Sequence, residues 1–97
     1  MRVMLRVSFP VEQGNKAIKD GSLAKTVTAF VERVKPESCY FFPRDGRRSA
    51  QFVFDMQESS QIPPTVEMFF DALHAEVELT PVMNLDDLKK GLQNLPK

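Results

Sequence analysis

Hydrophobic and polar residues alternate at the start of the chain, and this period of two gives way to a longer one. The first apolar set predicts a β-strand over residues 2–9 with two unlike faces, and its members are Val3, Leu5, Val7 and Phe9. Pro10 ends this strand. From residue 11 to 34 the spacing becomes helical, with one apolar stripe formed by Leu23, Val27, Phe30 and Val34.

The segment Asp20-Gly21-Ser22 interrupts the helical run. A glycine inside a helix costs about 1 kcal/mol relative to alanine. We therefore expect a kink or break near Gly21, with Ser22 as the local cap of the main helix.

Strand and helix patterns then alternate again. Residues 38–43 and 48–56 predict two strands, joined through Asp45-Gly46, a strong hairpin signal. A second helix is expected to begin at Ser59 or Ser60, with prolines in its first turn and a broad apolar face made of Ile62, Val66, Phe69, Phe70 and Leu73. Residues 75–83 predict a fourth strand. Asn84 then caps a short final helix, whose apolar side is Leu85, Leu88, Leu92 and Leu95.

This order of elements is β-α-β-β-α-β with one added C-terminal helix. It predicts an α+β fold of the ferredoxin-like arrangement, in which an antiparallel sheet carries both helices on one face. A chain of 97 residues has room for one such domain, so we assign residues 1–97 to a single domain.

Composition excludes several classes of function. Lysine and arginine number 13, and aspartate and glutamate also number 13; this balance disfavours a nucleic-acid partner. One cysteine and one histidine cannot form a Cys/His zinc site, and no phosphate-binding glycine pattern is present, so we expect neither a metal nor a cofactor. The N-terminal run fits neither a signal peptide nor a membrane span. We therefore expect a cytoplasmic protein without a membrane partner.

The side of the sheet that faces away from the helices becomes the functional question. On the first strand this side displays Arg2, Met4, Arg6 and Ser8, and on the fourth Glu76, Glu78 and Thr80. For the third strand we favour Gln51, Val53 and Asp55 as the outward set, although a slip of one residue would exchange it for Ala50, Phe52 and Phe54. Because the first and fourth strands are neighbours, Arg6 is expected to form an ion pair with Glu78 or Glu76.

Several phrases of the sequence resemble a family of small uncharacterised bacterial proteins of about this length. They are Asn15, Asp20-Gly21 and Lys25, Asp45-Gly46-Arg47-Arg48, Ser60-Gln61-Ile62-Pro63, and the run from Glu76 to Met83 with the acidic capped helix after it. This family resembles the dimeric α/β-barrel superfamily in strand order. The resemblance implies a ferredoxin-like fold and a homodimer. It assigns no catalytic residue.

The hypothesis that follows is a homodimer whose two sheet faces enclose a cavity for a small organic ligand. The side chains expected nearest to this cavity are Arg6, Tyr40, Glu78 and His74. As an enzyme it would be a cofactor-free isomerase or monooxygenase, with Glu78 or His74 as the base and Arg6 stabilising an oxyanion. Each residue also has a structural interpretation: His74 at a helix C-terminus, Arg6 in an ion pair, and Tyr40 in plain packing.

Two alternatives stay open. The rival hypothesis is a non-catalytic interaction or regulatory module that docks through its sheet face or through the leucine side of its final helix. A ligand-sensing module of the amino-acid-binding kind has the same strand order and would place its ligand near Gly14, at the first strand-to-helix turn.

Overall fold

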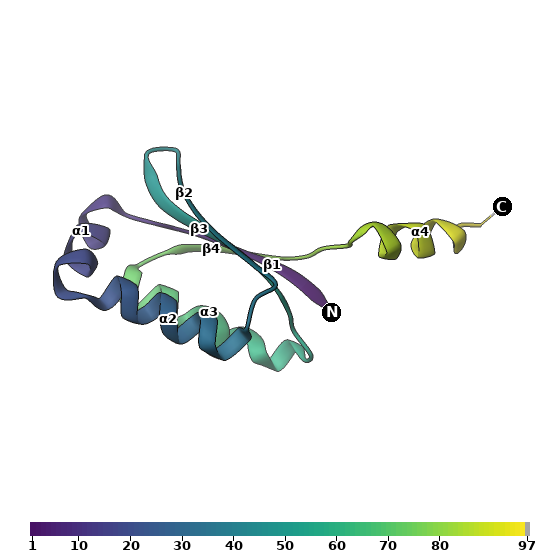
Figure 1. Cartoon of the computed structure of the whole chain (residues 1–97), viewed down its shortest axis with the longest axis horizontal. Coiled ribbons are helices and arrows are strands. Elements are labelled where there is room, and N and C mark those ends of the chain that lie inside the picture. Colours follow the sequence, from purple (N-terminus) through teal and green to yellow (C-terminus); the bar gives the residue numbers. More distant parts are fainter. Residues whose placement is uncertain (97) are drawn as a thin grey trace.

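The computed structural model describes residues 1–96 of the chain (Figure 1). Its elements are β1 (Arg2–Phe9), α1 (Val11–Asp20), α2 (Ser22–Val34), β2 (Ser38–Arg44), β3 (Arg47–Asp55), the 3-10 turn η1 (Ser59–Gln61), α3 (Ile62–Leu73), β4 (Glu76–Pro81) and α4 (Leu85–Gln93). The expected elements are all present, with strand boundaries that differ from the sequence-based ones by at most two residues. This confirms the α+β class.

Four antiparallel strands form one sheet in the order β2-β3-β1-β4. Helices α2 and α3 lie side by side against one face of this sheet, and α1 sits at the end of the same layer (Figure 1). No helix or strand among residues 1–96 covers the other face. We call this uncovered surface the open face.

The inward residues of β1 and β3 build the core between sheet and helices. On β1 they are the alternate apolar residues, from Val3 to Phe9, and on β3 they are Ala50, Phe52 and Phe54, all buried. The pairing of Arg6 with Gln51 fixes the register, so Gln51, Val53 and Asp55 point to the open face. The favoured assignment of the third strand is confirmed.

Aromatic rings fill the centre of this core. Phe30 of α2 lies 4.6 Å from Phe52 and 4.9 Å from Phe69 between ring centroids, and Phe54 packs edge-on against it at 5.7 Å. These tilted and edge-to-face arrangements are the favourable ones for aromatic pairs. The cluster joins α2, α3 and β3 into one unit.

The helical run breaks at Gly21, as expected, but its cap differs from the prediction. Gly21 has a φ of 81°, a left-handed conformation that glycine adopts without steric cost. Ser22 is the first residue of α2, and its backbone N–H donates to the Asp20 carboxylate at 2.8 Å. The prediction of Ser22 as cap is wrong, because Gly21 holds the N-cap position and Ser22 is already the first helical residue.

The start of α3 also differs. Neither Ser59 nor Ser60 caps it; both lie in the 3-10 turn. The side-chain oxygen of Gln61 accepts instead from the backbone N–H groups of Gln57 and Glu58, at 2.9 and 3.1 Å. Of the predicted apolar face, Val66, Phe69 and Leu73 are buried, whereas the two outer members, Ile62 and Phe70, are exposed.

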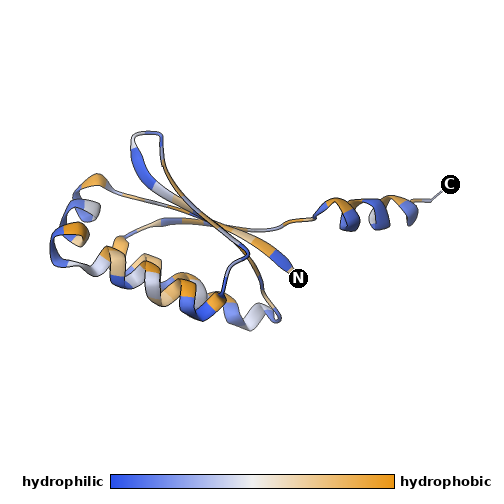
Figure 2. Cartoon of the chain, in the orientation of Figure 1, coloured by the Kyte–Doolittle hydropathy of each residue, from blue (hydrophilic) through white to orange (hydrophobic). Residues whose placement is uncertain are grey.

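The last helix extends away from the rest of the molecule (Figure 1). The Asn84 side chain accepts from Asp87 N–H at 2.8 Å, and the Asp87 carboxylate accepts from Asn84 N–H at 3.1 Å, so the predicted capping box is confirmed. No residue of α4 is buried. Figure 2 shows hydrophobic positions along this helix with no other element beside them.

Candidate functional site

An apolar cavity of about 330 Å³ lies between the helix-covered side of the sheet and the α1–α2 pair. Its lining comes from both helices, from β1, β2 and β3, and from the end of α3: Val7, Phe9, Ala17, Ile18, Gly21, Leu23, Ala24, Val27, Phe41, Ala50, Phe69 and Leu73. We refer to it below as the apolar cavity. Its volume falls at the small end of the range of ligand pockets.

Small residues at a bend in the chain create this space. Ala17, Gly21 and Ala24 present little or no side chain where α1 turns into α2. Ala50 faces them from the sheet and is itself buried. Larger side chains at these positions would occupy the volume, because protein interiors otherwise pack to nearly crystalline density.

The rim of the apolar cavity carries an exposed aromatic ring. Phe41 projects from the edge strand β2 and is 59% exposed, while its ring packs edge-on against Phe52 at a centroid distance of 6.0 Å. Ile18 of α1 lies on the same lining and is also exposed. An apolar ligand would therefore cover side chains that water now contacts.

The lining determines what chemistry the apolar cavity supports. Among the described residues, none that lines it is titratable. Such a surface binds apolar groups through burial and dispersion. It supplies no group for proton transfer.

The open face, on the other side of the sheet, brings three of the four candidate residues together. The strand registers place Tyr40 opposite Gln51, Gln51 opposite Arg6, and Arg6 opposite Glu78. Tyr40, Arg6 and Glu78 therefore share one row across all four strands. Tyr40 is 66% exposed, so its hydroxyl and ring are free to contact another molecule.

The expected ion pair of Arg6 is not formed. Arg6 Nε donates to Gln51 Oε1 at 3.0 Å, and no carboxylate within the described chain lies within 4.0 Å of its guanidinium. Glu76 instead accepts from Arg47 at 3.2 Å. The prediction is wrong because an exposed carboxylate gains at most about 1 kcal/mol from such a pair and stays hydrated at little cost.

A shallow hollow of about 140 Å³ lies at this part of the open face. Its lining is almost wholly charged, from Arg6, Ser8, Arg44, Asp45, Glu76 and Glu78. Charges of both signs meet there, and Glu78 lines it without an ion-pair partner among the described residues. This hollow becomes an enclosed site only if another molecule covers the open face.

His74 lies apart from the other three candidates. It ends α3 with a φ of 50°, and its backbone N–H donates to the Phe70 carbonyl at 3.1 Å. Its side chain is exposed and lines neither the apolar cavity nor the hollow on the open face. The position matches the structural interpretation of a histidine at a helix C-terminus.

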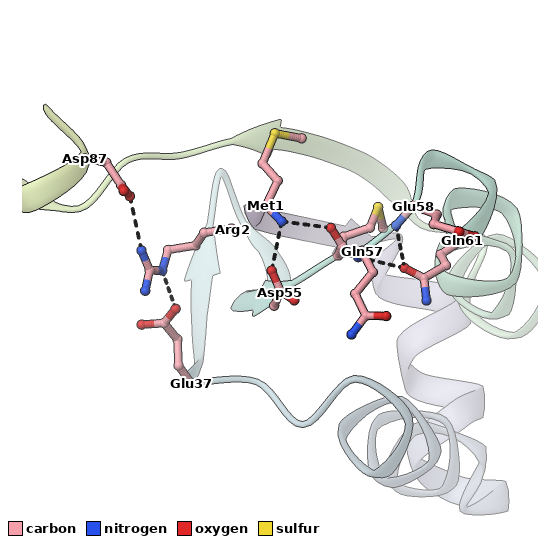
Figure 3. A network of polar contacts seen from close by, with 9 residues as sticks. Met1, Arg2, Glu37, Asp55, Gln57, Glu58, Gln61 and Asp87 are labelled. Atoms are coloured by element: carbon pink, nitrogen blue, oxygen red, sulfur yellow. Dashed lines mark hydrogen bonds and ion pairs between the residues drawn. The ribbon is translucent and has the colours of Figure 1, made fainter. Parts of the chain in front are cut away.

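A polar network ties the N-terminus and α4 to the sheet (Figure 3). The N-terminal ammonium donates to Asp55 at 2.9 Å, and Arg2 donates to Glu37 and, at 3.4 Å, to Asp87 of α4. The hydrogen bond and the charge of Glu37 raise the pKa of Arg2. This network orients α4 at its first turn and leaves the rest of the helix unsupported.

Cys39 behaves as expected of a structural residue. It lies opposite Phe52 on the helix-covered side and packs against the core. Partial burial raises the pKa of its thiol, which lowers the thiolate fraction and hence the reactivity.

The described residues contain no group of three His, Cys, Asp or Glu side chains placed to hold a metal ion. Over the same residues, no helix has the length and apolar character needed to cross a membrane.

The sequence-based prediction placed the candidate site on the open face and missed the apolar cavity. A signal for it exists in the sequence. Ala17, Gly21 and Ala24 recur at i, i+4 and i+7, which marks one stripe of small residues facing a sheet rich in phenylalanine.

Comparisons with known proteins support the fold. No protein-family model matches the chain. A search of curated proteins also finds no match. Among solved structures, a formyltetrahydrofolate deformylase from Pseudomonas putida KT2440 aligns with 84% of this chain at a TM-score of 0.56 and 15% identity; the aligned part is 29% of that enzyme. The designed protein Ferredog-Diesel aligns over 84% of this chain and 85% of its own, at a TM-score of 0.51 and 10% identity. At such identities, the likeness establishes a small α/β fold with a four-stranded antiparallel sheet.

Proposed function

We propose that this chain is a homodimeric binding protein for a small, mainly apolar molecule, with a ferredoxin-like fold of the dimeric α/β-barrel type. Read from the other edge, the strand order is β4-β1-β3-β2 with every pair antiparallel, and two helices cover one face. The similarity to a designed protein of nearly the same length supports this fold assignment.

The apolar cavity is the observation that carries the binding function. It combines a volume of about 330 Å³ with a lining of aliphatic and aromatic side chains. Ligand pockets typically have such a lining and begin at about 300 Å³. We propose a neutral ligand of small size, because the lining offers nothing to pair with a buried charge, and an unpaired buried charge costs several kcal/mol.

The open face supports the homodimer. It extends across four strands with no helix or strand of the described residues over it, and it exposes Tyr40 beside Met4 and Val53, which are half-buried. A second copy placed face to face would enclose the hollow at Arg6 and Glu78. This second cavity is the one that the sequence predicted, and a polar part of a ligand would meet Arg6, Tyr40 and Glu78 there.

We propose binding rather than turnover as the function of the apolar cavity. Catalysis as a cofactor-free isomerase or monooxygenase would have to use Arg6 and Glu78, which lie on the other side of the sheet. The second candidate function is a protein-interaction module, which the exposed leucines of α4 favour.

A neutral fluorescent probe, N-phenyl-1-naphthylamine, tests the binding function. We expect its fluorescence to rise on titration with the native protein, with saturation at one probe per chain. Ala24→Phe places a ring at the lining of the cavity and should weaken probe binding at least tenfold. Ala29→Phe is the matched control, since Ala29 is exposed on the same helix and does not line the cavity.

The controls make this experiment decisive. Equal probe binding by the native protein and both variants would contradict the proposed site, because it would place the probe elsewhere. Circular dichroism of each variant checks that the fold is retained.

A further inference from the structure

Three exposed leucines of α4, together with Leu95 just beyond the end of the helix at Gln93, follow a coiled-coil spacing. Leu85, Leu88, Leu92 and Leu95 recur at intervals of three, four and three residues, the a and d positions of a heptad repeat. They are between 40% and 63% exposed, and no described residue of the body covers them. We call this row the leucine seam.

The flanking residues also suit a helix–helix contact. Asp86, Asp87 and Lys90 fall on the sides of α4 away from the leucine seam, and Lys89 alone among the charged residues of the helix flanks it. Gly91 lies beside the seam, and a Cβ there would meet nothing within 4 Å. A second helix can therefore approach closely without burying a charge.

The register of the open face indicates how two copies would stack. We consider a two-fold axis that runs along the strands, between β1 and β3. It places β1 of one copy over β3 of the other, row by row. The positions that then face one another between copies are Arg2 with Asp55, Met4 with Val53, Arg6 with Gln51, Ser8 with Ser49, Tyr40 with Glu78, and Ser38 with Thr80.

In this arrangement, opposite charges face each other between the two copies, and apolar side chains face apolar ones. A cation faces a carboxylate at Arg2 and Asp55, and apolar chains meet at Met4 and Val53. Arg6 faces Gln51 of the second copy, a polar amide of the kind that already accepts a hydrogen bond from Arg6 within each chain. A two-fold axis that runs across the strands, through the row of Arg6, would instead place Arg6 over Arg6 of the second copy, so that two like charges would meet. Complementary potentials of this kind select the orientation of an interface.

The same axis directs the two C-terminal helices to one end of the dimer, from opposite edges of the stacked sheets, because β4 of each copy lies over β2 of the other. Helix α4 leaves β4 along the length of the molecule (Figure 1), and an axis along the strands sends both copies of it in the same direction. We propose that the leucine seam of α4 packs, parallel and in register, against the leucine seam of a second copy. This inference rests on the proposed homodimer.

The size of the seam explains why it needs the sheet interface. Two leucine seams together expose roughly 800 Å², below the total of about 1,200–2,000 Å² that a stable interface buries. Isolated helices of this length are also marginal in water. The leucine seam therefore extends the proposed dimer interface, which begins on the open face and continues into α4 beyond Pro81.

Disulfide trapping tests the pairing of α4. In a Cys39→Ser background, Leu85→Cys places a thiol at the first seam position, and Lys90→Cys places one on the opposite side of the same helix as the matched control. Mild oxidation should convert most of the Leu85→Cys protein to a covalent dimer on a non-reducing gel and little of the Lys90→Cys protein. Residue 85 is informative because antiparallel pairing would set the two thiols far apart.

A second measurement separates this inference from the homodimer. Sedimentation velocity of the native protein and of a Leu88→Ser, Leu92→Ser double variant should show a dimer whose dissociation constant rises at least tenfold in the variant. A native dimer with neither trapping at residue 85 nor weakening by the serines would overturn the α4 pairing and leave the homodimer standing. A native monomer would overturn both.

Discussion

At the scale of single residues, the buried ring of Phe30 contributes more to the stability of the fold than any of the surface ion pairs. It is fully buried and touches three other rings, Phe52, Phe54 and Phe69, which come from the sheet and from α3. The ion pairs, in contrast, join groups that are mostly half-exposed or more, where such pairs contribute at most about 1 kcal/mol.

Removing the Phe30 ring should therefore destabilise the fold strongly. We expect Phe30→Ala to lower the free energy of unfolding by about 3–5 kcal/mol, the range for a phenylalanine cut out of a core. Phe70→Ala is the control from the adjacent helix, since Phe70 is 42% exposed and should cost much less. Urea unfolding followed by circular dichroism measures both, and equal losses would contradict this account of the core.

The Asp20 carboxylate makes a pH-dependent contribution to the break between α1 and α2. Its hydrogen bonds with the side chain and the backbone N–H of Ser22 lower the pKa of Asp20. A carboxylate with a lowered pKa stabilises the folded state above its ordinary pKa, near pH 4, and this stabilisation is lost as the pH falls through the lowered pKa.

Asp20→Asn removes the titration and keeps a hydrogen-bond acceptor. The native protein should be the more stable of the two at neutral pH, and the difference should shrink on acidification below about pH 4. Urea midpoints measured from pH 7 downwards check this. A difference that stays constant with pH would refute the role of the Asp20 charge.

At the scale of elements, α1 and α4 each contain a glycine, but only the glycine of α1 has close neighbours. A Cβ at Gly14 of α1 would lie 2.8 Å from Arg48 Nη1 and 3.3 Å from the Phe9 ring, so the close approach of α1 to the sheet depends on this glycine. Gly91 of α4 has open space around it. The same residue type thus supports packing in one helix and only weakens the other.

In the Leu88→Ser, Leu92→Ser background, where the proposed pairing of α4 is weakened, Gly91→Ala should stabilise α4. Alanine is favoured over glycine by about 0.8–1.0 kcal/mol inside a helix, and nothing obstructs the added methyl group. Hydrogen exchange of the α4 amides should slow by up to about fivefold, the factor that corresponds to this free energy. Unchanged or faster exchange in that background would contradict this account of Gly91.

The sequence predicts these elements well because their signals are local. Alternation over β1, the Asp45-Gly46 turn and the Asn84 capping box each involve adjacent residues, and each is confirmed. The hydrogen bonds of the Asp20 and Gln61 side chains to nearby backbone N–H groups were missed because several polar residues lie close enough in sequence to accept from them. Which side chain accepts the hydrogen bond depends on the backbone conformation before and after the turn.

At the scale of the whole molecule, the two sides of the sheet have different properties. The covered side holds the aromatic core and the apolar cavity, whereas the open face carries paired rows of polar and charged residues. The proposed dimer uses both sides, with the ligand beneath the helices and the second copy on the open face.

The sequence could place Arg6 beside Glu78 because strand alternation and strand order determine which residues are neighbours, but it named Tyr40 as a candidate without fixing its row, which only the register of β2 against β3 supplies. It could not show the partner of Arg6, since the choice between Gln51 and Glu78 depends on side-chain rotamers. The apolar cavity was not predicted, because the small residues Ala17, Gly21 and Ala24 indicate an unfilled space only once it is known how α1 and α2 meet the sheet in three dimensions.

Native mass spectrometry of the freshly purified protein tests the homodimer, on which the proposed assembly depends, and reports any bound molecule in the same spectrum. We predict a species of twice the chain mass. A dimer that retains ligand through purification should show the added mass of one or two ligand molecules, because each chain has one apolar cavity. A spectrum of monomer alone at micromolar concentration would contradict the account, because the open face would then be a hydrated surface and α4 would have no second copy to meet.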